Sequence, residues 1–139
     1  ATELPPSAAL VIDPGLPTLI YTSYQLDPHW HRDQPANRVL LLEPSHFRTY
    51  PVSAQVLEFI LALSENIPDV QVFVGEFDQL VARYGIEKVV FKEHPTTRHY
   101  RGTEEPRDWM FDITGAYPSF FAFWKQCKKQ LQLRTNRVS

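Results

Sequence analysis

The sequence predicts an α/β fold: a Rossmann-like three-layer sandwich whose mainly parallel sheet of four to five strands is flanked by helices. Two observations predict it. Arg38 to Glu43 contains an unbroken apolar run without alternation, which is typical of a strand buried on both faces of a parallel sheet. A helix with an apolar stripe, Ser53 to Asn66, follows this strand, with Ser53 as its expected N-cap, and further strand–helix pairs come after it.

Composition places the chain among ordinary globular domains. Its 139 residues are 43% hydrophobic, which is enough for one domain with a substantial core. The formal net charge of -2 gives no overall attraction to nucleic acid. Cys127 is the single cysteine, so an internal disulfide and a multi-cysteine metal cluster are excluded. No apolar run approaches the length of a membrane span and no signal peptide is visible, so we expect a cytoplasmic protein that makes no membrane contact.

The first half of the chain reads as linker, strand, loop and strand. Residues 1–17 contain four prolines and form a linker or edge segment, in which Leu10 to Ile12 is a candidate short edge strand. Thr18 to Leu26, rich in β-branched and aromatic residues, is the expected first inner strand. Asp27 to Asn37 is a loop too short to hold a crossover helix and both of its turns. A second loop, Ser45 to Tyr50, separates the buried strand from its helix.

The second half begins with two strands around a short helix. We expect a third strand at Val70 to Val74 and a fourth at Lys88 to Lys92. The helix Phe77 to Tyr84 lies between them, and Gly85 suits the position that follows a helix.

The end of the chain is expected to be a long loop and a final helix. Thr96 to Pro118 is polar, and a loop of that length inside a compact domain is usually functional or covers an interface. The last helix is expected at Phe120 to Leu133. The domain therefore spans residues 18–134, and residues 135–139 form a tail.

Polar side chains gather where the first two inner strands end. In a parallel sheet, ligands bind just beyond the carboxyl ends of the strands. The chain places five candidates for a pocket that binds a planar, polar ligand there: Tyr24, Gln25, Glu43, Ser45 and His46. An alternative interpretation of Glu43 is structural, because a buried carboxylate can cap a neighbouring backbone N–H or pair with an arginine.

For two other sets of polar residues, a structural role is the favoured interpretation. His29 and His31 would share one face of a strand and could bind a metal there, but they lie in a proline-flanked loop without a third ligand, so a surface position is favoured. The loop after the fourth strand carries further acids and histidines whose spacing fits no metal motif. Acid–base chemistry is one interpretation of this second group, and a polar loop held by arginine salt bridges is the favoured one. Its members are Glu93, His94, His99, Glu104, Glu105 and Asp108, with Arg98, Arg101 and Arg107 as the arginines.

Several short motifs resemble the photolyase/cryptochrome superfamily. The chain is similar to the Rossmann-like antenna domain of bacterial, Bacteroidetes-type proteins described as deoxyribodipyrimidine photolyase-related or FAD-binding-domain proteins. In related bacterial proteins a strand ending in Gly-Asp-Gln-Leu leads through a short loop to a strand ending in glutamate. This chain keeps Gln25, Leu26 and Glu43, and has Tyr24 where those relatives have aspartate. The other matching segments are Val74 to Phe77, Lys92 to Pro95, Glu104 to Trp109 and Tyr117 to Cys127.

The resemblance implies a part in a larger flavoprotein. FAD would lie in a separate, helical domain of a parent protein, which the chain's start at Ala1 rather than methionine also suggests. The parent would be a deoxyribodipyrimidine photolyase (a lyase that repairs DNA in light) or a blue-light sensor. This domain would make no DNA contact of its own and carry no catalytic residue. It would hold an antenna chromophore of flavin, lumazine or folate type. Two alternatives remain: a free-standing small-ligand or nucleotide-binding module, and an interaction domain without ligand.

Overall fold

A computed structural model describes residues 2–6 and 8–107 of the chain. The chain divides into two compact units, Ala1–Pro106 and Arg107–Ser139, and the fold below is that of the first unit. The predictions for the second half of the long loop, the last helix with Cys127, and the tail lie outside the described residues.

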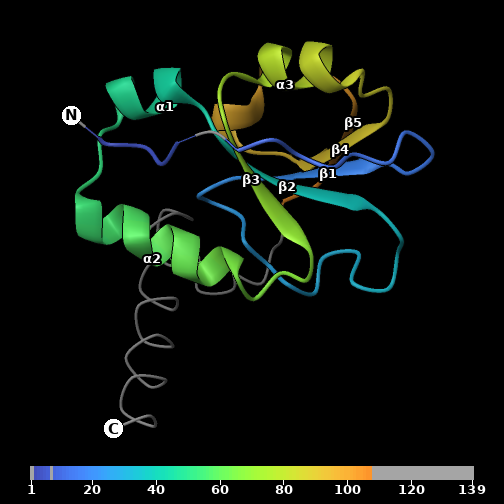
Figure 1. The fold of residues 1–139 in the computed structure, drawn as a ribbon, viewed down its shortest axis with the longest axis horizontal. Helices are drawn as coiled ribbons and strands as arrows, with labels where there is room; N and C mark the ends of the chain where they lie inside the picture. The colour runs from blue at the N-terminus through green and yellow to red at the C-terminus, as the bar shows by residue number, and fades with distance from the viewer. Residues whose placement is uncertain (1, 7, 108–139) are drawn as a thin grey trace, which may run out of the picture. The chain divides into compact units, whose positions relative to one another are not determined.

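The first unit contains one five-stranded sheet in which every pair of neighbouring strands is parallel (Figure 1). The order of its strands is β3-β2-β1-β4-β5. The bounds are β1 Thr18–Tyr21, β2 Asn37–Leu42, β3 Val70–Val74, β4 Val89–Lys92 and β5 Thr103–Glu105. The predicted Rossmann-like α/β fold with a parallel sheet is therefore confirmed, and the sheet is parallel throughout.

Helices cover both faces of this sheet, which gives the three predicted layers. Figure 1 shows α3 (Phe77–Tyr84) on one side of the strands and α2 (Ala54–Ser64) on the other. All six residues of β2 are buried, as an unbroken apolar strand between two helical layers requires. Val39 and Leu41 belong to the core cluster under α3, while Leu40 and Leu42 point to the opposite face because side chains alternate along a strand.

Two predicted helix signals are confirmed. The Ser53 hydroxyl accepts a hydrogen bond of 3.2 Å from the Val56 N–H, so this residue caps α2 as its position before the apolar stripe predicted. Gly85 ends α3 in the left-handed region with φ of 60°.

The first inner strand is shorter than predicted. The sequence predicted Thr18 to Leu26, but β1 ends at Tyr21 because the next residues form a tight turn. Thr22 and Gln25 exchange backbone hydrogen bonds of 3.3 and 3.1 Å across this turn, and the Tyr24 N–H donates to the Thr22 hydroxyl. The turn aims residues 22–25 at the carboxyl edge of the sheet.

The predicted loop Ser45 to Tyr50 is in fact a short helix, α1 (Pro44–Thr49). Pro44 suits the first helical position because it has no N–H to leave unpaired there. Phe47 is buried and anchors the helix to the core.

Part of the predicted polar loop after β4 is also ordered. It contains a 3-10 turn, η1 (Pro95–Thr97), and the edge strand β5. Gly102 precedes β5 with φ of 140°, and a Cβ at this residue would lie 2.5 Å from the Val89 carbonyl oxygen. Only glycine combines that backbone with so close an approach, so Gly102 lets β5 reach β4.

The N-terminal segment lies beside the domain without forming the short strand expected at Leu10 to Ile12. The side-chain amide of Gln71 in β3 instead accepts from the Val11 N–H at 2.7 Å and donates to the Val11 carbonyl at 2.8 Å. Leu10 is buried in the core cluster, and its N–H donates to the Tyr84 hydroxyl. Side chains therefore take the place of strand pairing along this segment.

A buried arginine organises the loop that replaces the first crossover helix. The Arg38 guanidinium donates to the Tyr21 hydroxyl at 2.7 Å and to the backbone carbonyls of Trp30, His31 and Gln34. The loop from β1 to β2 thus folds around one cation, without a helix, as its length predicted. Within residues 2–6 and 8–107, none of the helices has the length and apolar character that crossing a membrane needs.

Candidate functional site

The site lies where the strand order of the sheet reverses. β1 and β4 are neighbours in the sheet, and the chain continues from β1 to β2 on one side and from β4 to β5 on the other, so the connections after these two strands run in opposite directions. Such a switch point leaves a crevice beyond the carboxyl ends of the two diverging strands. The turn after β1 and the segment after β4 supply its two sides, and α1 supplies its third.

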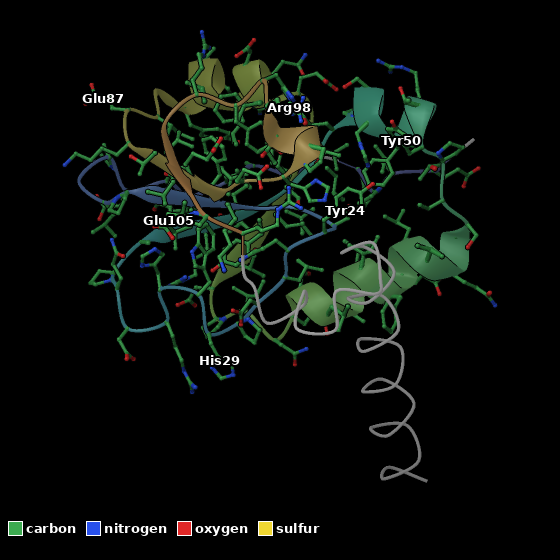
Figure 2. All side chains as sticks on the ribbon, turned by 180° about the vertical axis from the view of Figure 1, so that it is seen from behind. Tyr24, His29, Tyr50, Glu87, Arg98 and Glu105 are labelled. Atoms are coloured by element: carbon green, nitrogen blue, oxygen red, sulfur yellow. The ribbon has the colours of Figure 1, made fainter. Side chains whose placement is uncertain are left out.

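Aromatic and imidazole rings from these three segments meet in the crevice. The ring of Tyr24 stacks on that of His94, with centroids 4.4 Å apart and planes inclined by 20°. The Tyr24 hydroxyl lies 3.0 Å from Nε2 of His46, a hydrogen bond between the first turn and α1. Figure 2 shows Tyr24 and Tyr50 apart from His29, which lies at the bottom of the view.

Glu43 follows β2 and is 5% exposed. One of its carboxylate oxygens accepts from the Phe77 N–H at 3.0 Å, and the two oxygens lie 2.8 and 2.9 Å from Nε2 of His99. The structural interpretation is therefore confirmed in one respect, because Glu43 caps the first backbone N–H of α3. Its ionic partner is a histidine rather than the arginine considered from the sequence.

Burial and the Glu43 carboxylate also affect the pKa of a neighbouring phenol, that of Tyr100. Burial, and then the proximity of the Glu43 carboxylate, raise the pKa of Tyr100 well above its ordinary value. Tyr100 therefore stays protonated at neutral pH, and its ring stacks on Phe77 with centroids 4.6 Å apart. The side chains at the base of the crevice, Glu43, His99 and Tyr100, are therefore held in place by one another and by Phe77.

The pKa of His46 is lowered by burial and, to a smaller extent, by repulsion from His99. The folded protein therefore favours neutral His46 over the imidazolium. A neutral imidazole next to a phenol is able both to donate and to accept hydrogen bonds.

A small cavity opens beside these groups. Its volume is about 20 Å³, and a cavity needs about 10–15 Å³ to hold one water molecule. The polar residues that line it are Thr22, Ser23, Glu43, His46, Thr96 and Tyr100. This cavity has room for a water molecule and not for an aromatic ring.

The structure brings together three of the five predicted site residues: Tyr24, Glu43 and His46. Ser45 lies apart from them on the surface, where its N–H and hydroxyl both donate to the Glu76 carboxylate. Gln25 is not among the residues that line the cavity, and both polar atoms of its side chain are buried without a hydrogen-bond partner in the described structure. It remains a prediction that any of the five binds a ligand.

Residues after β4 complete the site, although the sequence reading treated them as a polar loop. His94, Thr96, His99 and Tyr100 all contribute to the crevice or its base. The sequence could have predicted that His94 and Thr96 belong to the site. Residues that follow one parallel strand lie at the same edge of the sheet as those that follow its neighbour. Of the expected salt bridges, Arg101 pairs with Asp78 in α3 at 2.7 Å, and both side chains are exposed.

The two loop histidines have separate surroundings. Nε2 of His31 lies 2.6 Å from the Glu105 carboxylate in β5, and His29 is exposed. In the part of the chain that the structure describes, no group of three side chains is arranged to hold a metal ion.

The fold and the crevice define a Rossmann-like α/β domain with one polar, ring-lined site at its switch point. Comparisons with protein-family models, with curated proteins and with solved structures found no match to this chain.

Proposed function

We propose that residues 18–134 form the antenna-like α/β domain of a cytoplasmic photolyase/cryptochrome-related flavoprotein, and that the domain alone carries out no reaction. The strand order β3-β2-β1-β4-β5, the direct loop from β1 to β2 and the glutamate that follows β2 support this proposal together. The related proteins named above share that unusual start, in which a short loop leads to a strand ending in glutamate.

On this proposal the chemistry belongs to the parent protein. FAD lies in its helical domain, and light-dependent DNA repair or blue-light sensing takes place there. The domain described here would dock on that partner and would touch DNA only through it. An antenna chromophore of flavin, lumazine or folate type would bind at the carboxyl edge of the sheet, beside Tyr24, Glu43 and His46.

The cavity described beside these groups has no room for such a chromophore as it stands. The cavity of about 20 Å³ is smaller than any of these ring systems. The chemistry of its walls is nevertheless suitable, because hydroxyl and imidazole groups are the kind of polar anchors found in small-molecule sites.

The absorption spectrum of the full-length parent, purified gently, tests the proposal. We expect the bands of bound flavin, and a colourless parent would rule the proposal out. The isolated chain gives the second test, by thermal shift with flavins, lumazines and folates. A ligand at about one hundred times its Kd stabilises a folded protein by about 2.7 kcal/mol.

Two histidine variants locate the response. His46→Ala should abolish the thermal shift because its ring lines the cavity. His29→Ala removes an exposed histidine that lies apart from Tyr24 and should leave the shift unchanged (Figure 2). Equal responses in the two variants would place binding elsewhere.

One observation favours a second candidate, an interaction domain without ligand. The rings of Tyr24, His46 and His94 pack against one another at this edge, and the cavity described beside His46 has a volume of only about 20 Å³. This candidate predicts no response to any of these compounds or to nucleotides. A response to nucleotides, from a parent that lacks flavin, would instead indicate a free-standing nucleotide-binding module.

A further inference from the structure

Tyr24 is held in the crevice in the way that a protein holds a planar ligand. One face of its ring stacks on His94 at 4.4 Å with an inclination of 20°. Its edge carries a hydroxyl that bonds Nε2 of His46 at 3.0 Å, and the His46 ring meets it edge-on at 83°. A stacked face and a polar anchor at the edge are the two usual features of a site for an aromatic ring.

His94 and His46, two of the groups that contact Tyr24, are themselves fixed. Nδ1 of His94 accepts a hydrogen bond of 3.1 Å from the backbone N–H of Thr96. The backbone N–H of His94 donates to the Thr97 hydroxyl. His46 belongs to α1, and its ring packs against that of Tyr50 with centroids 5.3 Å apart. A slot with fixed walls remains when its occupant leaves, because its side chains need no reordering.

The turn that carries Tyr24 is not fully satisfied in this position. Gln25, the next residue, buries both the nitrogen and the oxygen of its side-chain amide without a hydrogen-bond partner in the described structure. A buried amide without partners opposes the arrangement that buries it. The closed turn therefore competes with arrangements in which Gln25 finds a partner and Tyr24 moves.

We propose that Tyr24 occupies the place of a ligand ring between His94 and His46, and that it closes the crevice until a planar aromatic ring with a hydrogen-bonding group at its edge displaces it. The proposal rests on the proposed function in one respect, that this edge of the sheet binds a ligand. It goes further in naming the class of ring and the side chain that stands in for it.

Removing the ring tests the proposal, because the vacated slot should accept the missing side chain as a free molecule. We expect p-cresol to raise the unfolding midpoint of Tyr24→Ala in a saturable way and to raise the wild-type midpoint much less, because in wild type it must first displace Tyr24. Toluene, which lacks the hydroxyl, should bind the variant more weakly because it cannot bond Nε2 of His46. Tyr24→Ser removes the same ring, suits a turn, and replaces the alanine variant if that one does not fold.

Two control variants separate the slot from other effects. Tyr24→Phe keeps the ring in the crevice, so p-cresol should raise its midpoint much less than that of Tyr24→Ala. Val11→Ala shortens an apolar side chain that is 82% exposed, so it opens no enclosed slot and should respond no more than wild type. A folded Tyr24→Ala or Tyr24→Ser variant that ignores p-cresol, or controls that respond equally, would overturn the proposal.

The outcomes also separate this proposal from the proposed function. If p-cresol binds the alanine variant but no flavin, lumazine or folate binds either protein, the ring slot stands and the antenna function is wrong. If a chromophore binds wild type and Tyr24→Ala with the same affinity, the function stands and the gating role of Tyr24 is wrong. Tighter binding of the chromophore by the alanine variant supports both.

Discussion

Replacing Glu43 measures how much the base of the site contributes to folding. Glu43→Ala leaves the buried Phe77 N–H without its acceptor, which costs about 1–3 kcal/mol. It also removes a negative charge from the start of α3, worth about 0.3–1 kcal/mol. The pair with His99 adds at most about 1 kcal/mol, because that histidine is 55% exposed and solvent screens the interaction. We therefore expect a loss of about 2–4 kcal/mol.

Urea unfolding of the two Glu43 variants checks this value. Glu43→Gln is the matched control, since its amide oxygen still accepts from Phe77 and only the charge is lost. Hydrogen bonds to charged groups are about twice as strong as neutral ones, so we expect the glutamine variant to lose about half as much. A loss below about 1 kcal/mol for the alanine variant, or a gain in stability, would show that the carboxylate is not paired as described.

Three further predictions concern the scaffold. Gly102→Ala should lower the free energy of unfolding in urea by about 1–3 kcal/mol or more, because φ of 140° and the nearby Val89 carbonyl exclude a Cβ. Arg38→Met should cost at least about 3 kcal/mol in the same assay, since several oxygens lose a charged donor. The pKa of His46 is lowered in the folded state, so the unfolded chain takes up the proton first as the pH falls. Stability should therefore decline as the pH drops below the ordinary value of 6.5, and His46→Gln should reduce that decline.

Each of these has its own contrary result. Gly15→Ala is the control for Gly102, because a Cβ there meets only the Asp13 side chain at 3.3 Å, and equal losses would contradict the strain argument. A loss under about 1 kcal/mol for Arg38→Met would mean that the loop does not depend on that cation. Identical pH profiles for wild type and His46→Gln would show that His46 titrates alike in both states.

Strong periodic patterns made much of the fold predictable. The unbroken apolar run of β2 and the apolar stripe, serine cap and closing glycine of the two longer helices are local signals, and each appears where it was expected. β5 gave no such signal. Its residues Thr103 to Glu105 are polar, and it becomes a strand only because Gly102 lets it pair with β4.

The same distinction applies to the site. Parallel strands end at one edge of a sheet, so the sequence was enough to bring Tyr24, Glu43 and His46 together. It was not enough to choose their partners. The Glu43 carboxylate bonds residues that lie 34 and 56 positions away in the chain, and only the packing of α3 and of the loop after η1 fixes those pairs.

NMR mapping of ligand binding on the wild-type chain is the most direct test of a chromophore site at the switch point. We expect a flavin, lumazine or folate to shift the amide signals of residues 22–25 and 94–97 first, since these segments form the two sides of the crevice. Shifts confined to the opposite edge of the sheet, around Pro17 and Lys88, or no shifts with any of the three compounds, would contradict it.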